Sequence, residues 1–177
     1  MQKRIALLYG TTEGQSAKIA HHMAHHLRVR GADAAAMHLA ELPLDYDPVQ
    51  NSDAFVVIAS VHQGVHQRYV ADFARTHATL LNERPSAFLS VSLQAAFGAG
   101  EEATQTLEDF LRAAGWTPTM TLCVPGALRY TSYNWLKQLV MRSIAKERGE
   151  PTNTGEDVEY TDFGALDAFA DDFLQKL

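Results

Sequence analysis

The chain has 177 residues, 46% of them hydrophobic and 20% charged, which is typical of one globular domain with a substantial core. Its formal net charge of −6 argues against general attraction to nucleic acid, while its single cysteine, Cys123, excludes an intrachain disulfide and favours a reducing, cytoplasmic setting. No apolar run reaches the length of a membrane-spanning helix, and the short one after Arg4 is typical of a buried strand rather than a signal peptide.

Apolar runs of strand length alternate with helical patterns, which predicts βαβ units and a parallel sheet. Strands are expected at 3–9, 32–39, 54–60, 86–93 and 119–125. Helices are expected at about 15–30, 68–81, 101–114 (with Gly115 as its C-cap) and 162–177. The predicted fold is a single domain over 1–177, an α/β/α sandwich of three layers. Its five-stranded parallel sheet has the order 2-1-3-4-5, with a long insertion at about 127–161 before the last helix.

A hydroxyl-rich loop, YGTTEGQS at 9–16, follows the first expected strand. Gly14 allows a sharp turn, and the hydroxyls of Thr11, Thr12 and Ser16 join the unpaired N–H groups of the next helix. A phosphate monoester fits such a loop. The Gly-Lys-Ser/Thr ending of a Walker A loop and the G-x-G-x-x-G dinucleotide fingerprint are both absent. The alternative is an ordinary strand–helix turn rich in capping residues.

This loop resembles the flavodoxin phosphate loop, T-x-T-G-x-T/S, which holds the phosphate of FMN. Glu13 stands in place of the second threonine and Gln15 fills the variable position. The resemblance implies a flavodoxin-like fold and FMN as cofactor. It assigns phosphate contacts to the whole loop, namely Thr11, Thr12, Glu13, Gly14, Gln15 and Ser16.

Ligands of such sheets bind outside the carboxyl ends of the strands, which predicts that two further loops meet the phosphate loop. These are Ser60, Val61, His62, Gln63 and Gly64 after the third strand, and Ser92, Leu93 and Gln94 after the fourth. The resemblance gives both loops flavin-facing roles. His62, Gln63 and Gln94 are candidates for hydrogen bonds to the ring edge, and Phe97 for stacking. Each of these side chains alternatively caps a loop or faces water.

The stretch from 126 to 161 is too long for an ordinary connection, so a functional role is expected. Its first half, 126–149, carries five basic side chains against one acidic side chain, and it predicts an amphipathic helix bearing Trp135. A basic helix of this kind binds an anionic membrane surface, a partner or a lipophilic anion. The alternative is a helix that packs its apolar stripe on the domain.

The strings at 77–93 and 125–163, which include GALRYTSYNW and EDVEYTDF, resemble the menaquinone-dependent protoporphyrinogen IX dehydrogenases of bacterial haem synthesis. The departure from the family lies at 94–106, where this chain lacks basic residues before its acidic pair Glu101 and Glu102. The resemblance implies that protoporphyrinogen IX is oxidised through FMN, with a membrane quinone, menaquinone or ubiquinone, as electron acceptor. It also implies a cytoplasmic protein bound peripherally to the inner surface of the cytoplasmic membrane.

The resemblance further implies that a set of residues contacts substrate or membrane, and these are Arg129, Tyr130, Tyr133, Trp135, Lys137 and Arg142. Arg129, with Lys137 or Arg142, would pair with the two propionates of the substrate. No general base is obvious from the sequence, and the candidates are His62 and His66.

Four histidines at 21, 22, 25 and 26 have helical metal-ligand spacing, but no third ligand accompanies them, so no metal site is expected. Three other functions remain open from the residues: a flavodoxin-type electron carrier, a quinone reductase supplied by a nicotinamide cofactor, and a non-enzymatic binding module. Formation of a homo-oligomer also remains open.

Overall fold

The computed structural model of the protein describes residues 2–42, 47–96, 100–128 and 158–177. Its main sheet contains the five expected parallel strands: β1 (Arg4–Gly10), β2 (Asp33–His38), β3 (Ala54–His62), β5 (Ser86–Ser92) and β6 (Met120–Pro125). They follow the order β2-β1-β3-β5-β6, which is the predicted order 2-1-3-4-5 when the parallel strands alone are numbered.

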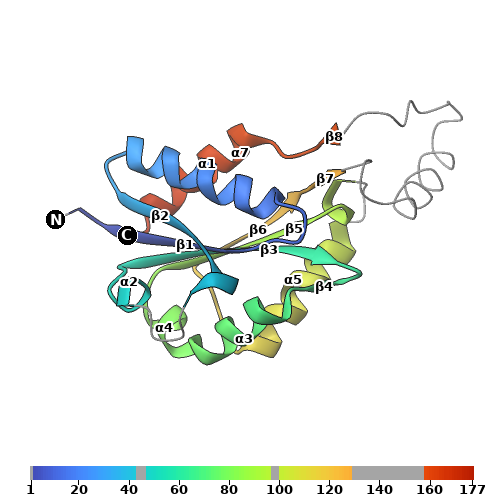
Figure 1. The fold of residues 1–177 in the computed structure, drawn as a ribbon, viewed down its shortest axis with the longest axis horizontal. Helices are drawn as coiled ribbons and strands as arrows, with labels where there is room; N and C mark the ends of the chain where they lie inside the picture. The colour runs from blue at the N-terminus through green and yellow to red at the C-terminus, as the bar shows by residue number, and fades with distance from the viewer. Residues whose placement is uncertain (1, 43–46, 97–99, 129–157) are drawn as a thin grey trace, which may run out of the picture.

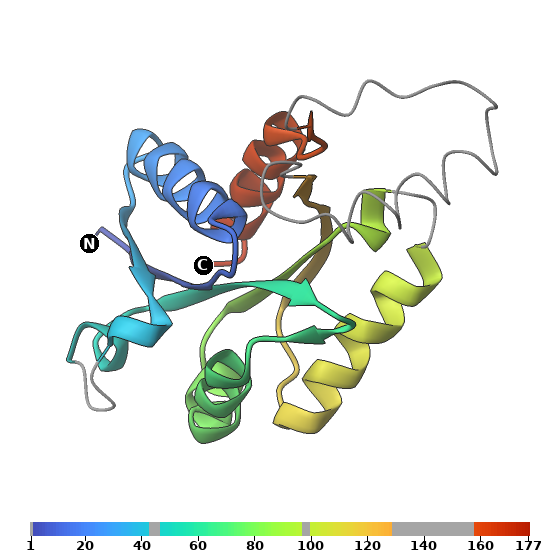
Figure 2. The ribbon, with the colours of Figure 1, turned by 45° about the vertical axis from the view of Figure 1, so that its right-hand side comes forward.

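Helices cover both faces of this sheet and complete the three layers (Figure 1). One face carries α1 (Gln15–Val29) and α7 (Phe163–Leu174). The other carries α3 (Arg68–Thr76), α4 (Ala78–Glu83) and α5 (Gly100–Ala114), as Figure 2 shows from a second direction. Short helical turns lie at η1 (Leu39–Glu41), α2 (Asp47–Gln50) and η2 (Gln94–Ala96).

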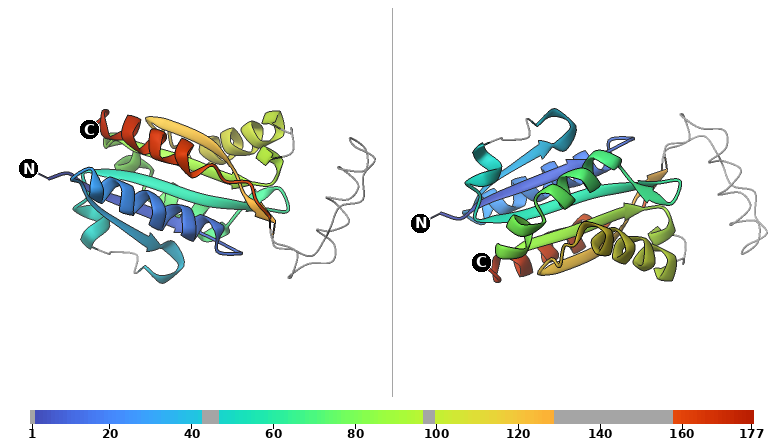
Figure 3. Two further views of the ribbon diagram at one scale, coloured as in Figure 1. Left: turned by 90° about the horizontal axis from the view of Figure 1, so that it is seen from above. Right: turned by 90° about the horizontal axis from the view of Figure 1, so that it is seen from below.

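The core is divided by the sheet into two apolar clusters, because successive strand residues point to opposite faces. Ile5 and Leu7 of β1 belong to the cluster that α1 and α7 cover, whereas Ala6 and Leu8 belong to the cluster under α3, α4 and α5. The two helical layers are seen from above and below in Figure 3. Burial on both faces explains why the strands read as continuous apolar runs in the sequence.

One face of α7 packs on the sheet, since Leu166, Phe169, Ala170 and Phe173 are buried and Leu174 is partly buried against the same cluster. The predicted role of Gly115 is confirmed. Its φ is +65°, its N–H donates to the Arg112 carbonyl, and the N–H of Trp116 reaches back to Leu111, which is a Schellman ending.

The single helix expected at 68–81 is wrong in one respect, because the chain forms two helices there. His77 leaves the helical region with φ −106° and ψ 18°, ending α3 and beginning α4. Its Nδ1 lies 3.1 Å from the Phe73 carbonyl oxygen, and its ring stacks on Phe73. The N–H of His77 still donates to the Phe73 carbonyl at 2.9 Å, so the break is a local change in the dihedral angles of one residue.

Two short antiparallel pairs were not expected, and both extend from the carboxyl edge of the sheet. In the first, β3 continues to His62 and turns through Gln63 and Gly64 into β4 (Val65–His66). Both turn residues have positive φ, 52° and 81°, which is the type I′ turn that suits a two-residue hairpin. In the second, β7 (Ala127–Leu128) pairs with β8 (Val158–Glu159) at the two ends of the predicted insertion.

None of the helices in the described ranges is both long enough and apolar enough to span a bilayer.

Candidate functional site

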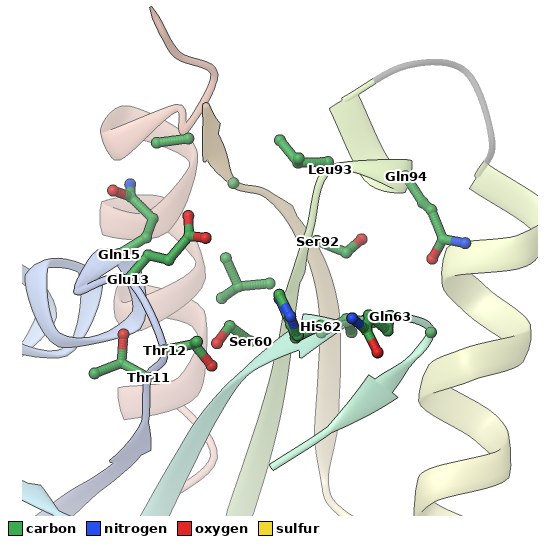
Figure 4. Close-up of a pocket in the computed structure, with 15 residues that line it drawn as sticks. Thr11, Thr12, Glu13, Gln15, Ser60, His62, Gln63, Ser92, Leu93 and Gln94 are labelled. Carbon is green, nitrogen blue, oxygen red and sulfur yellow. The ribbon is translucent and has the colours of Figure 1, made fainter. Parts of the chain in front are cut away.

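A pocket lies where the chain leaves the carboxyl ends of β1, β3, β5 and β6 (Figure 4). The structure thus brings together the three loops that the sequence singled out. The pocket is lined by Thr11, Thr12, Glu13, Gln15, Ser60, Val61, His62, Gln63, Gly64, Val91, Ser92, Leu93, Gln94, Gly126 and Ala127. This is the edge at which open α/β sheets bind their ligands.

Gly14 turns the chain from the loop into α1 with a φ of +88°, a conformation that a glycine adopts without steric cost. As the N-cap residue it gives the helix no side-chain cap. Its own N–H donates to Oγ1 of Thr11 at 2.8 Å. The first-turn N–H groups of an α-helix have no partner within the helix, so this end of α1 is suited to an anion.

The hydroxyls around this helix end are arranged as hydrogen-bond donors. Thr11 Oγ1 accepts from Gly14, while Thr12 Oγ1 and Ser60 Oγ both accept from the side-chain amide of Gln67. A hydroxyl that accepts from the protein still has its proton to donate. Ser16 Oγ is fully buried, and the described residues offer it no hydrogen-bond partner. Four hydroxyl donors therefore lie around one helix end, which matches the acceptor oxygens of a phosphate.

Among the described lining residues there is one carboxylate, Glu13, and no lysine or arginine. Within this part of the lining, the groups suited to hold an anion are hydroxyls, N–H groups and the dipole of α1. Figure 4 shows Thr11, Thr12 and Ser60 close together on the side of the pocket where β1 and β3 end.

The side chains expected near a flavin ring differ in the elements that carry them and in their hydrogen bonds. His62 and Gln63 line the pocket from the β3–β4 hairpin. Gln94 also lines it, but its Nε2 donates to Glu102 of α5, and its Oε1 is buried without a partner among the described residues. Phe97 lies outside the described residues.

His66, the second candidate base, is not among the residues that line the pocket. It lies on β4, where its Nε2 is 2.9 Å from Ser90 Oγ and its ring contacts Phe88 and Phe110. Burial lowers the pKa of the His66 imidazole to about 4, so it is neutral at physiological pH. The structure gives it a packing role, because hairpin pairing turns this position toward the α5 layer.

The Gln15 side chain also departs from its expected role, although the residue borders the pocket. Its Nε2 donates to Glu159 Oε1 at 2.8 Å and to Thr161 Oγ1 at 2.9 Å. That nitrogen is therefore committed within the protein. The backbone of Gln15, at the first position of α1, and its side-chain oxygen remain to face a ligand.

A family model of the flavodoxin domain matches residues 6–155, which is most of the chain. The protoporphyrinogen IX dehydrogenase [quinone] of Escherichia coli K12 is 35% identical over 169 residues, covering 93% of this chain and 91% of the relative. The chain belongs to this dehydrogenase family within the flavodoxin domain proteins. A relative of the same name from Leishmania major is 28% identical over 180 residues, covering 94% of this chain and 73% of that protein.

Solved flavodoxins share the fold of this dehydrogenase family member at low sequence identity. Oxidised flavodoxin 1 of Bacillus cereus aligns with a TM-score of 0.61 at 14% identity, covering 99% of both chains. The flavodoxin of Streptococcus pneumoniae TIGR4 aligns with a TM-score of 0.60 at 15% identity, covering 98% of this chain and 99% of the other. These likenesses confirm the predicted flavodoxin-like fold.

Membership of the dehydrogenase family makes the chain a flavodoxin-like oxidoreductase, and the fold implies a flavin cofactor. The residues present fit the phosphate end of a flavin nucleotide. The unpartnered buried hydroxyl of Ser16, the uncapped helix end at Gly14 and the donor hydroxyls of Thr11 and Thr12 all meet that requirement.

Sequence reasoning missed four residues of this dehydrogenase site. Gly126 and Ala127 line the pocket after β6, and the rule about carboxyl ends of strands, applied to the fifth parallel strand, would have found them. Gln67 and Tyr69, at the start of α3, hold the phosphate loop. Tyr69 Oη accepts the N–H of Thr11 at 3.1 Å, and burial raises the pKa of its hydroxyl, which therefore stays protonated.

The residues expected to contact substrate or membrane lie outside the described residues, and these are Arg129, Tyr130, Tyr133, Trp135, Lys137 and Arg142.

Two histidines of α1 form hydrogen-bonded pairs with α7: His22 with Asp167, and His26 with Asp171. In the described part of the dehydrogenase chain, no group of three or more His, Cys, Asp or Glu side chains is arranged to hold a metal ion.

Proposed function

We propose that this protein oxidises protoporphyrinogen IX to protoporphyrin IX, using bound FMN and a membrane quinone, menaquinone or ubiquinone, in haem biosynthesis. The observation that carries the proposal is the alignment over nearly the whole chain with a relative named for this reaction. The hydroxyl-lined pocket at the carboxyl edge of the sheet supports the choice of cofactor, because a monophosphate fits its single helix end.

In this proposal the FMN phosphate binds the loop from Thr11 to Ser16, with Gly14 providing the turn. The flavin ring would lie between the 60–64 loop and the 92–94 loop, with Gly126 and Ala127 at its edge. Bound FMN supplies the two-electron redox chemistry. The chain positions the ring and substrate and excludes water. Six electrons and six protons leave the porphyrinogen in total, and three quinones take them up as quinols.

Substrate protons need an acceptor near the ring. In the described pocket lining His62 is the sole imidazole, whereas His66 lies elsewhere with its pKa lowered. We assign the proton-accepting role to His62, which the β3–β4 hairpin holds at the pocket edge. A histidine suits this role because its imidazole nitrogen can accept a proton and release it again.

The porphyrinogen carries two propionates and a lipophilic ring, and the quinone is lipophilic as well. We assign the propionates to Arg129 together with Lys137 or Arg142. Trp135 and the two tyrosines, Tyr130 and Tyr133, would face the lipophilic ring or the membrane surface. A cytoplasmic protein bound peripherally to the inner face of the cytoplasmic membrane would satisfy both requirements.

Anaerobic turnover tests this proposal. The FMN-loaded protein is mixed with protoporphyrinogen IX and a menaquinone analogue, and porphyrin fluorescence is followed against a reaction without quinone. Quinone-dependent fluorescence is expected. Flavin binding without turnover would contradict the dehydrogenase assignment and favour an electron carrier, while rapid flavin bleaching by a nicotinamide cofactor would favour a quinone reductase.

The proposed membrane role has a separate test. Trp135→Asp places a charge on the apolar stripe and is expected to weaken sedimentation with anionic vesicles several-fold, while FMN content is unchanged. Equal vesicle binding by the variant and the parent would refute the membrane role of Trp135.

A further inference from the structure

A cluster of polar side chains ties the first turn of α1 to the C-terminal connector, which we define as residues 159–162. Gln15 Nε2 donates to Glu159 Oε1 at 2.8 Å and to Thr161 Oγ1 at 2.9 Å. Lys18, one turn further along α1, pairs with the second oxygen of Glu159 and lies over the ring of Phe163. Gln15 and Thr161 are only 8% and 9% exposed, so the hydrogen bond between them is shielded from water, whereas Glu159 is exposed.

The connector is bonded in turn to the pocket lining at Gly126. Thr161 Oγ1 donates to the Pro125 carbonyl at 2.7 Å, and the N–H of Tyr160 donates to the Gly126 carbonyl at 3.1 Å. The N–H of Gly126 donates to the Ser92 carbonyl at 3.0 Å, at the end of β5. A continuous series of hydrogen bonds therefore runs from the phosphate-loop helix to the opposite side of the pocket.

This series links two parts of the pocket lining that come from opposite ends of the chain. One side is the α1 end with its hydroxyl donors, and the other is the backbone of Gly126 and Ala127. Only three side chains take part in this series: Gln15, Glu159 and Thr161. The two hydrogen bonds at Gly126 join backbone groups. Loss of the Gln15 amide would remove the hydrogen bonds of α1 to Glu159 and Thr161, while the ion pair of Lys18 with Glu159 would remain.

We propose that Gln15 and Glu159 are positioning residues that set the distance between the phosphate loop and the Gly126–Ala127 backbone. The inference rests on the proposed FMN binding. It adds that hydrogen bonds within the protein contribute to FMN affinity by positioning the parts of the pocket. Glu159 holds the amide of Gln15 with one oxygen and the ammonium of Lys18 with the other. It thereby fixes the side-chain orientation of Gln15 toward the connector.

The test uses Gln15→Met, which preserves length but removes the donor, and Glu159→Ala, which removes both acceptors. FMN dissociation constants are measured by flavin fluorescence, and the midpoint potential of the bound flavin is measured by dye equilibration. Each variant is expected to weaken FMN binding about tenfold and to shift the potential. The double variant is expected to lose less affinity than the sum of the two single losses, since both changes remove the Gln15–Glu159 hydrogen bond.

The chain offers a matched control on the same helix. His22 of α1 lies 2.7 Å from Asp167 of α7, so this pair also joins α1 to the C-terminal part of the chain, but away from the pocket. Asp167→Asn is expected to lower the melting temperature of the apoprotein and to leave the FMN dissociation constant within about twofold of the parent. A hydrogen bond with a purely structural role is expected to affect the melting temperature and not the FMN affinity.

Unchanged FMN affinity and potential in Gln15→Met and Glu159→Ala, with a lower melting temperature alone, would overturn the inference. If Glu159→Ala does not fold, Glu159→Gln keeps an acceptor for Gln15 and loses the ion pair. It should then retain affinity within about threefold, and a tenfold loss would contradict the inference. Failure of the parent protein to bind FMN would be seen in the first titration, and it would refute the proposed function itself.

Discussion

The side-chain amide of Gln67 donates to Thr12 Oγ1 at 3.0 Å and so joins the start of α3 to the phosphate loop. The same nitrogen donates to Ser60 at the end of β3. Gln67 thus decides which way two hydroxyl protons point, because each hydroxyl that accepts from it is left to donate to a ligand.

Gln67→Met preserves the shape of the side chain and removes its donor. The hydroxyls of Thr12 and Ser60 would then turn their protons elsewhere, and FMN binding is expected to weaken about tenfold, the equivalent of about one to two hydrogen bonds. Fluorescence titration measures this change. Arg68→Met, at the next position and on an almost fully exposed side chain, is the control and should bind FMN as the parent does. Equal affinity in both variants would show that Gln67 does not orient these hydroxyls.

Ser16→Ala is expected to change apoprotein stability and cofactor affinity in opposite directions. The buried Oγ of Ser16 has no partner among the described residues, so its removal should leave the free energy of unfolding unchanged or raise it by about 1 kcal/mol. Loss of a hydrogen bond to a phosphate should raise the FMN dissociation constant by about tenfold or more. Urea unfolding and FMN titration measure the two effects. A clear loss of apoprotein stability would show that this hydroxyl has a structural role instead.

Gly14→Val should abolish flavin binding. A β-branched residue at a φ of +88° is strained by about 1–2 kcal/mol, and relief of that strain moves the loop that would hold the phosphate. Gly115→Val is the control, because Gly115 also has positive φ but lies at the end of α5, where an added Cβ meets nothing within 4 Å. The control should lose stability and still purify with flavin. A fully loaded Gly14→Val protein, judged by its visible absorbance, would refute the phosphate-loop assignment.

Acidification should destabilise the protein through His66. Its pKa is lowered from 6.5 to about 4 by burial, so between these values the unfolded chain binds a proton that the folded chain does not. Stability is therefore complete above pH 6.5 and falls as pH decreases toward 4, by about 2 kcal/mol between pH 7.5 and 5. His66→Gln, which retains a hydrogen bond to Ser90, should remove this part of the pH dependence in urea unfolding.

The same variant also tests whether His66 takes part in catalysis. Since His66 is not a pocket-lining residue, His66→Gln should retain kcat within about threefold at neutral pH. A much larger loss with flavin still bound would restore His66 as a candidate base.

The parallel sheet was predictable because strands buried on both faces give continuous apolar runs of strand length, such as Ala54–Ser60. Pattern alone did not reveal the break at His77, since the apolar period continues through it while the side chain bonds to Phe73. The loops of the site were predictable from the carboxyl-end rule. The contacts of Gln67 and Tyr69 with the phosphate loop were not, because they join positions 55 and 58 residues apart and leave no local signal.

The β7–β8 ladder sets position 128 directly opposite position 158, so the chain leaves the sheet edge and returns to it at one place. A two-residue Asn-Gly turn bridges antiparallel partners of this kind. The same turn would suit the two ends of this ladder, so the described part of the chain could be closed there into a shorter flavodoxin-like core.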